Sequence, residues 1–336
     1  MDDTSGIKGF DINEVPQELL SYIKTGSKFI IIGHKEPDGD CVGSQLALRS
    51  ALLRLKKEVI VCSTGPFKRT ELKDYTTYFL SSLNETEKSD ARLIIVDCTG
   101  KDRIGDLQDS IKDLPLAIID HHSSATHPNS TNEAPVYIDA NSPSCTLLIE
   151  KLITSLGLEL TADEATWLLF GLCTDTGFFR HLTEKNAAVF EAIARMVRAG
   201  ANPKQAYNIM NGGKTLSSRI LLGKVLSRTE EHFNGKLMYS YETLEEFKKY
   251  GFEARDSDAL NKMLLSIEGV EAVMVIRQEC EETCSVSLRS IDKIDVSKIA
   301  VSFGGGGHKN ASGLTMQGSI SYIKEKILET FSGYFI

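Results

Sequence analysis

The sequence has no excess of positive charge and no long apolar segment. Lysine and arginine number 38 against 46 aspartates and glutamates, so the formal net charge is −8. This balance argues against wrapping long duplex nucleic acid on a basic face, but it permits a small anionic substrate held at a metal ion. No apolar run is long enough to cross a membrane, and the acidic start, Met1 to Thr4, lacks the apolar core of a signal peptide. We therefore expect a cytoplasmic protein that does not contact membranes.

Cysteine pairs with metal-binding spacing are also missing. The seven cysteines are scattered along the chain, and none belongs to a Cys-x-x-Cys motif. This pattern indicates neither a zinc ribbon nor a disulfide framework. The chain has 336 residues, of which 41% are hydrophobic and 25% charged. That is the composition of an ordinary globular protein, and the length suggests two domains.

Apolar runs alternate with helical patterns in the first part of the chain. The runs that predict buried strands are 29–32, 58–62, 93–97 and 116–122. Helical patterns cover 13–25, 42–57, 72–83, 145–156, 162–173 and 187–198. This alternation predicts an α/β fold with a mostly parallel sheet. From Lys236 the composition changes, and further strands and helices predict a smaller α/β domain. We expect a catalytic domain at 1–205, a helical linker at 206–228 with the connection at Asn211-Gly212-Gly213, and a second domain at 229–336.

An imidazole and two carboxylates follow the first predicted strand within seven residues. They belong to His34, Asp38 and Asp40. Like charges this close repel each other unless a cation lies between them, and imidazole with carboxylates is a suitable ligand set for Mn²⁺ or Zn²⁺. An EF-hand is excluded because Arg49, not Glu, stands at the twelfth position from Asp38. On this segment alone, an Asp-Gly-Asp surface turn is the simplest alternative.

Two more predicted strands end in side chains of the same kind. They carry Asp97 in one case and Asp120, His121 and His122 in the other. The carboxyl ends of parallel strands meet at one edge of a sheet, where ligands of such sheets bind. Asp175 follows an apolar helical pattern, and the polar stretch 123–135 is a candidate lid. The sequence therefore predicts a metal site at this edge.

A run of four glycines, Gly304 to Gly307, marks the second domain. Such a run is usually a flexible linker, but here it joins a helical pattern that ends at Phe303 to His308 and Lys309. Glycines let the backbone approach a ligand closely and point N–H groups at an anion. The loop therefore indicates a phosphate-binding site.

Taken in order, these motifs resemble the DHH family of phosphoesterases. The N-terminal set is His34-x₃-Asp38-x-Asp40, Asp97, Asp120-His121-His122 and Asp175. The loop at 304–313 is similar to the signature of the family's DHH-associated C-terminal domain. One compact catalytic domain followed by this domain is similar to the stand-alone nano-RNases and cyclic-dinucleotide phosphodiesterases. Family II inorganic pyrophosphatases share the N-terminal motifs but not the glycine-run domain.

The resemblance implies a centre with two Mn²⁺ ions, with Mg²⁺ or Co²⁺ as substitutes. The implied metal ligands are His34, Asp38 and Asp175 for the first ion, Asp40 and His121 for the second, and Asp97 between the two. His122 would lie near the scissile phosphate, so His122 and Asp97 are the expected catalytic residues. We expect Asp120 to fix the ring of His121.

The resemblance also implies the substrate site and the activity. Arg289, Gly305, Gly306, Gly307 and His308 would hold a substrate phosphate or a terminal nucleotide. The implied reaction is hydrolysis of short oligoribonucleotides, cyclic di-AMP or linear diadenylate to 5′-mononucleotides. The alternatives are a phosphatase acting on 3′-phosphoadenosine 5′-phosphate and a nucleotide sensor without turnover, and the complete ligand set argues against the sensor. We expect no partner among long duplex nucleic acids, and a homodimer as an assembly.

Overall fold

The computed structural model describes residues 14–122, 134–291 and 293–335. The chain divides into two compact units, Met1–Gly213 and Lys214–Ile336, at the glycines expected to connect the domains. All but the last two residues of the candidate lid at 123–135 lie outside the described residues. In the described ranges, no helix combines the length and the apolar character needed to cross a membrane.

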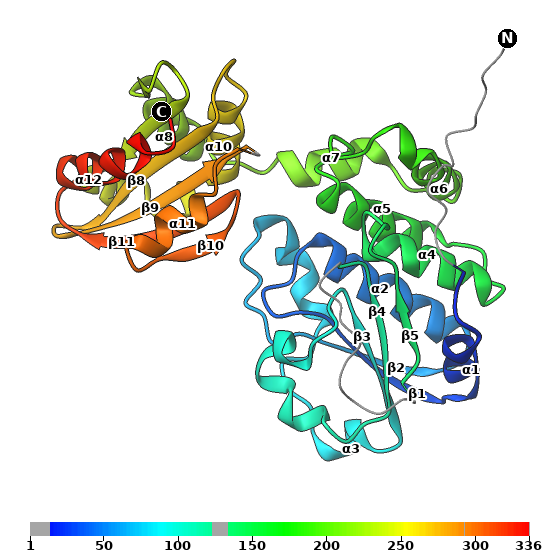
Figure 1. Ribbon diagram of the computed structural model, residues 1–336. Helices are drawn as coiled ribbons and strands as arrows, with labels where there is room; N and C mark the ends of the chain where they lie inside the picture. Colours follow the sequence, from blue (N-terminus) through cyan, green and yellow to red (C-terminus); the bar gives the residue numbers. More distant parts are fainter. Residues whose placement is uncertain (1–13, 123–133, 292, 336) are drawn as a thin grey trace, which may run out of the picture. The chain divides into compact units, whose positions relative to one another are not determined.

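Five parallel strands form the sheet of the first unit, in the order β2-β1-β3-β4-β5 (Figure 1). Their bounds are Lys28–Ile32 (β1), Glu58–Cys62 (β2), Ala91–Val96 (β3), Leu116–Asp120 (β4) and Val136–Ile138 (β5). The inner strands have no polar alternation because both of their faces are buried, as Ile30 and Ile31 show on opposite faces of β1. The predicted α/β class with a parallel sheet is confirmed. β5 was not predicted, since three residues carry too little pattern.

Helices α2 and α4 cover one face of this sheet, and α5 packs on these two helices. The helices of the unit are α1 (Gln17–Thr25), α2 (Gly39–Arg54), α3 (Glu85–Lys88), α4 (Cys145–Ser155), α5 (Ala162–Asp175), α6 (Ala187–Arg198) and α7 (Pro203–Asn211). The opposite face packs against Ile104, Leu107 and Ile111 from two 3₁₀ segments. The helix expected at 72–83 is a 3₁₀ helix at Thr70–Tyr78. Of the described side chains in this segment, Leu72 alone is buried, so the segment lacks the apolar stripe of an α-helix.

The second unit has a mixed six-stranded sheet in the order β10-β11-β9-β8-β7-β6. The strands are β6 (Glu230–His232), β7 (Leu237–Glu242), β8 (Ala272–Cys280), β9 (Thr283–Ser290), β10 (Gly306–His308) and β11 (Ala311–Gln317). The helices are α8 (Leu216–Ser227), α9 (Leu244–Tyr250), α10 (Ser257–Leu265), α11 (Val296–Ser302) and α12 (Ile320–Ser332). Neighbouring strands are antiparallel except for β7 and β8. This smaller α/β unit with its glycine-rich loop agrees with the predicted second domain.

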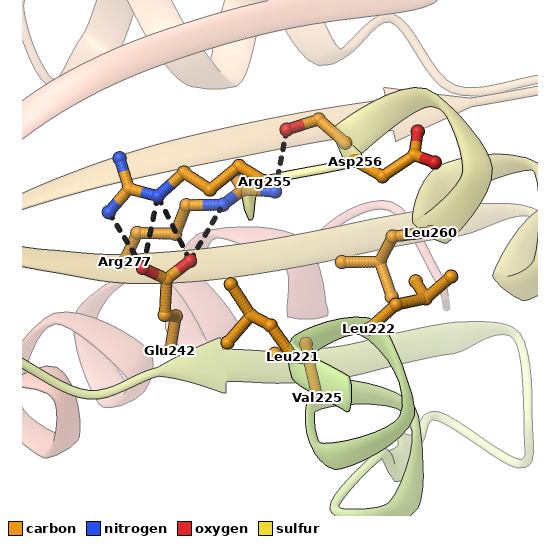
Figure 2. Close-up of a pocket in the computed structure, with 9 residues that line it drawn as sticks. Leu221, Leu222, Val225, Glu242, Arg255, Asp256, Leu260 and Arg277 are labelled. Carbon is orange, nitrogen blue, oxygen red and sulfur yellow. Dashed lines mark hydrogen bonds and ion pairs between the residues drawn. The ribbon is translucent and has the colours of Figure 1, made fainter. Parts of the chain in front are cut away.

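The two faces of the second sheet are covered differently. α11 and α12 pack on one face, against Val286 and Leu288 of β9. On the other face, α8 and α10 pack against β7 and β8, where Leu221 and Val225 of α8 are buried (Figure 2). The range 206–228, expected to be a linker, is therefore divided. Ala206 of α7 is buried in the core of the first unit, and α8 belongs to the second.

Two glycines allow α2 and α5 of the first unit to pack closely. A Cβ atom on Gly43 would lie 2.5 Å from the backbone oxygen of Trp167. A Cβ atom on Gly171 would lie 2.5 Å from Thr146 Cγ2 and 3.0 Å from Asp40 Cα. This helix contact therefore also sets the position of Asp40, which lies in the first turn of α2.

We predict that Gly43→Ala destabilises the protein by about 1–3 kcal/mol, the usual cost of overpacking a core. The added methyl group meets a backbone oxygen that cannot move without shifting α5. Gly223→Ala in α8 is the matched control, because nothing lies within 4 Å of a Cβ atom there. Alanine is favoured over glycine in a helix, so this control should be neutral or stabilising. Urea denaturation measures both variants, and a fully stable Gly43→Ala protein would contradict the close contact.

Candidate metal centre and substrate groove

Three neighbouring strands bring the predicted ligands to one edge of the first sheet. β1, β3 and β4 are adjacent and parallel, so their carboxyl ends lie side by side. α2 starts and α5 ends at the same edge. The segments after the strands and these two helix ends place together all six predicted metal ligands: His34, Asp38, Asp40, Asp97, His121 and Asp175.

His34 lies between two carboxylates. Its Nε2 is 3.8 Å from Asp38 Oδ1 and 3.4 Å from Asp97 Oδ2. Asp38 is also the N-cap of α2, and its Oδ1 accepts hydrogen bonds from the backbone N–H groups of Asp40 and Cys41, both at 3.1 Å. The helix that Asp38 starts therefore fixes the direction of its carboxylate.

His121 contacts three carboxylates. Its Nε2 lies 3.5 Å from Asp40 Oδ2, 3.4 Å from Asp97 Oδ1 and 3.3 Å from Asp175 Oδ2. Asp97 thus contacts His34 through one oxygen and His121 through the other, a position from which it can bridge two ions. The resemblance implies that Asp175 binds the same ion as His34 and Asp38. The packing of α5 on α2 places Asp175 in one group with Asp40 and His121.

The backbone of Asp97 has a left-handed conformation. Its φ is 61°, which is uncommon for a residue other than glycine. The N–H group of Asp97 donates a hydrogen bond to the backbone oxygen of Ile119 at 2.9 Å, and the residue is 2% exposed. Such conformations cost free energy and cluster at functional sites. The conformation is therefore consistent with a functional role for this carboxylate.

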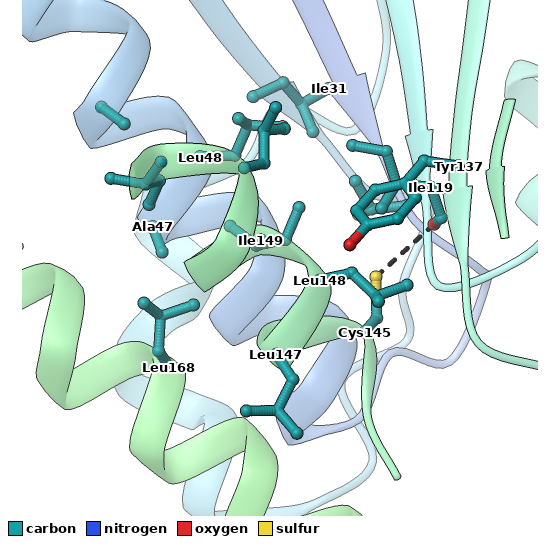
Figure 3. Close-up of a cluster of buried hydrophobic side chains, with 14 of the residues drawn as sticks. Ile31, Ala47, Leu48, Ile119, Tyr137, Cys145, Leu147, Leu148, Ile149 and Leu168 are labelled. Atoms are coloured by element: carbon teal, nitrogen blue, oxygen red, sulfur yellow. Dashed lines mark hydrogen bonds between the residues drawn. The ribbon is translucent and has the colours of Figure 1, made fainter. Parts of the chain in front are cut away.

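Asp40 is stabilised by the start of α4. Its two carboxylate oxygens accept hydrogen bonds from the backbone N–H groups of Cys145 at 2.6 Å and Thr146 at 2.8 Å. Cys145 is held in turn by a hydrogen bond from its Sγ to the backbone oxygen of Ile119 at 3.5 Å (Figure 3). A helix N-terminus favours an anion. This anchor was not predicted, although Ser144 before an apolar helix is a signal for a helix start.

Burial and neighbouring charges change the proton affinities of the cluster. Burial alone would lower the pKa of His34, but the carboxylates beside it raise the pKa to about 10. Burial would also lower the pKa of His121, but Asp175 and Asp97 raise it to about 11. Burial, Asp97 and Asp175 raise the pKa of Asp40. The cluster therefore attracts positive charge, and it would release protons when metal ions bind.

Two buried atoms at the centre have no hydrogen-bond partner within the described part of the chain. They are Asp97 Oδ1 and His121 Nε2, which lie 3.4 Å apart. Buried polar atoms without partners are costly, and a divalent cation would satisfy both. Cys41 Sγ, which we expected to be a packing atom beside the site, lies near the ligand atoms of His34 and Asp97. The residues present fit a metal centre.

The glycine run forms part of a groove in the second unit. The groove has a volume of about 740 Å³, and its lining includes Gly304–Gly307 and Arg289 of β9. Arg289 donates a hydrogen bond to the backbone oxygen of Leu288 at 2.9 Å, and none of the described carboxylates pairs with its guanidinium group. His308 is exposed at the end of β10 and does not line the groove. The structure thus brings Arg289, Gly305, Gly306 and Gly307 together, and leaves His308 outside the lining.

Comparison with known proteins identifies the family. Residues 28–172 match the DHH family, N-terminal domain, and residues 234–335 match the DHHA1 domain. The bifunctional oligoribonuclease and PAP phosphatase NrnA of Thermus thermophilus is 30% identical over 300 residues, which cover 89% of this chain and 87% of that protein. This chain belongs to the DHH family of phosphoesterases. It is a hydrolase that acts on phosphoester bonds, as predicted.

Other known proteins also match over most of this chain. The cyclic-di-AMP phosphodiesterase GdpP of Bacillus subtilis is 26% identical over 339 residues, which cover 95% of this chain and 50% of that protein. The crystal structure of an exopolyphosphatase-related protein from Bacteroides fragilis superposes with a TM-score of 0.78 at 24% identity, covering 95% of this chain and 96% of that one. This likeness confirms the fold.

The expectation that Asp120 fixes the ring of His121 is wrong. Asp120 Oδ1 lies 2.7 Å from His122 Nδ1 and accepts backbone hydrogen bonds from His121 and His122. The ring of His121 faces the backbone oxygen of Ser142 instead, at 3.2 Å from Nδ1. The contact with Asp120 raises the pKa of His122. Since the side chain of His122 is 38% exposed, its remaining ring nitrogen can reach a ligand.

We predict that His121→Ala and His122→Ala separate metal binding from catalysis. His121→Ala should lose bound metal, because it removes a nitrogen that faces three carboxylates. His122→Ala should keep the metal content of the wild type and lower kcat by about 10²–10⁴-fold, the usual contribution of a general acid. Elemental analysis after dialysis, together with steady-state kinetics, measures both effects. Equal metal loss in the two variants would show that His122 is a ligand.

Proposed function

We propose that this DHH-family hydrolase is a two-metal phosphodiesterase for short nucleotides. Its substrates would be short oligoribonucleotides, linear diadenylate or cyclic di-AMP, and its products 5′-mononucleotides. The observation that carries the proposal is that two buried atoms of the carboxylate cluster, Asp97 Oδ1 and His121 Nε2, make no hydrogen bond within the described residues. The names of the relatives in Thermus thermophilus and Bacillus subtilis support this substrate range.

The side chains present would hold two ions, for which we propose Mn²⁺. The first would bind to His34, Asp38 and Asp97, and the second to Asp97, Asp40, His121 and Asp175. Bound divalent cations supply a lowered pKa for the attacking water and charge stabilisation for an in-line displacement at phosphorus. Carboxylates provide the negative charge needed to hold two dications close together.

In the proposed reaction His122 acts on the phosphate rather than on the ions. Asp120 Oδ1 forms a hydrogen bond with Nδ1 of His122 at 2.7 Å, which fixes the orientation of the ring. The protonated form that this carboxylate favours can donate a hydrogen bond from Nε2 to a phosphoryl oxygen or to the leaving group. The partial exposure of the ring gives a substrate access to this nitrogen.

A phosphatase acting on 3′-phosphoadenosine 5′-phosphate is the second candidate. The name of the Thermus thermophilus relative includes this activity, and both reactions need attack on a phosphoester at the same metals. A sensor without turnover is disfavoured because all six ligand side chains are present and converge. We also propose a cytoplasmic location, where a reducing environment suits seven free cysteines.

We predict that the purified protein with Mn²⁺ hydrolyses diadenylate and short RNA with a higher kcat/KM than 3′-phosphoadenosine 5′-phosphate. Elemental analysis should find two ions per active chain. Asp97→Asn should abolish turnover and weaken both sites, because its carboxylate contacts both histidines. Asp113→Asn, at an exposed position, is the control and should behave like the wild type. A single ion in fully active protein would refute the two-metal centre, and a preference for 3′-phosphoadenosine 5′-phosphate would favour the second candidate.

We also predict that Arg289→Ala and His308→Ala weaken hydrolysis of diadenylate. The proposed reason is that the second unit binds the part of the substrate away from the metals, and such remote binding orients the reacting phosphate. A role in substrate binding is better supported for Arg289, which lines the groove, than for the exposed His308, which does not. Both variants should keep their metal and should cleave bis-p-nitrophenyl phosphate almost normally. Equal losses on the two substrates would show that these residues do not read the remote part.

A further inference from the structure

The groove of the second unit contains a second arginine that the proposed function does not use. Its lining includes Arg277 of β8 as well as Arg289, together with the hydroxyl groups of Ser285, Ser287 and Thr315. None of the lining residues is an aspartate or glutamate. A concave surface with two guanidinium groups, several hydroxyl groups and exposed glycine backbone is suited to more than one phosphate.

The strand register places the two arginines at different ends of this surface. Side chains of β9 alternate between faces, so Ser285, Ser287 and Arg289 lie on the same face. Arg277 is paired with Ser285 across β8 and β9, four residues along β9 from Arg289. At about 3.4 Å per residue, the backbone positions of the two arginines are roughly 14 Å apart along the strand. This separation exceeds the rise of about 3.4 Å per nucleotide in a stacked strand, so the surface can span more than one nucleotide.

The charge of Arg277 is only partly neutralised by the protein. Glu242 lies between Arg255 and Arg277 (Figure 2). Arg255 Nε is 3.0 Å from both oxygens of Glu242, whereas Arg277 Nε is 3.7 Å from the nearer one. Arg255 also binds both oxygens of Glu279 at 3.0 Å. Glu242 and Glu279 therefore make their short contacts with Arg255, and Arg277 keeps only the longer ion pair with Glu242.

Arg277 is nevertheless held in place. Its Nη2 donates a hydrogen bond to Ser257 Oγ at 3.1 Å, and the residue is 8% exposed. Burial lowers its pKa, and the positive charges of Arg255 and Arg289 lower it further, although a guanidinium group stays charged in proteins. A buried cation with spare N–H donors that faces a groove is ready to bind an anion at little entropic cost.

We infer that Arg277 binds an additional phosphate of a linear oligonucleotide, beyond the phosphate held at Arg289 and the glycine loop. This inference rests on the proposed function, and it makes Arg277 a determinant of substrate length. A 5′-phosphorylated triadenylate has one phosphate more than the corresponding diadenylate. Arg277 should therefore matter for the trinucleotide and hardly for the dinucleotide.

The test compares these two substrates on the full-length, Mn²⁺-loaded protein. Arg277→Gln should lower kcat/KM for triadenylate by about tenfold or more, the usual effect of losing a charged hydrogen bond, and for diadenylate by less than about twofold. Lys262→Gln, which removes an exposed charge from α10, should change neither. Arg277→Lys keeps the charge but loses the planar fork, so triadenylate should be affected to an intermediate degree.

The ratio of the two kcat/KM values within one variant is independent of the folded fraction, so a destabilised Arg277→Gln protein still gives an answer. If that variant does not fold at all, Arg277→Lys supplies the ratio. Equal losses on both substrates, no loss on either, or a wild type that cleaves diadenylate but not triadenylate would each overturn the inference while the proposed function stands. A wild type that cleaves neither would overturn both.

Discussion

The main physical constraint on the first unit is that several buried carboxylates lie close together and repel one another. Asp40 and Asp97 are 0% and 2% exposed, and Asp38 and Asp175 complete the cluster around two imidazoles. Removing charges from water without counter-charges is expensive. The carboxylates raise the pKa of His34 to about 10 and that of His121 to about 11, so positive charge on these imidazoles relieves part of the repulsion. A fold gains nothing from such a cluster in its own right, so the cluster is explained by the cations that it can bind.

The scaffold meets this repulsion with partial charges. The first turn of α2 donates N–H groups to Asp38, and the first turn of α4 donates them to Asp40. Such donors stabilise a carboxylate without occupying the space that a metal ion needs. A lysine at the centre would neutralise the cluster but would compete with the ions. Among the described residues, Arg69 is the one arginine or lysine that forms an ion pair with a metal ligand. Its half-exposed guanidinium group lies 4.0 Å from the carboxylate of Asp38.

Local pattern was sufficient to predict most of the first unit, because buried parallel strands are continuous apolar runs. The sheet order, which places β1, β3 and β4 side by side, then explains why ligands from distant segments meet. The sequence could not show what depends on tertiary contacts. Ser144 marks the start of α4, but the sequence does not show that the backbone N–H groups there point at Asp40. The expectation that Asp120 orients His121 rested only on their being neighbours in the sequence. The grouping of Asp175 required the packing of α5 on α2. Short elements such as β5 and β10 carry too few residues for a pattern.

The arginines of the second unit have two kinds of surroundings. Arg255 is hydrogen-bonded to Glu242 and Glu279, whereas Arg277 and Arg289 line a groove that has no aspartate or glutamate in its lining. A chain of net charge −8 cannot attract an anionic polymer through its overall field. It can bind an anion only where local cations are left without full counter-charges. In the second unit the arginines of the groove are such a place, and in the first unit the cations that the metal ligands would hold could provide another.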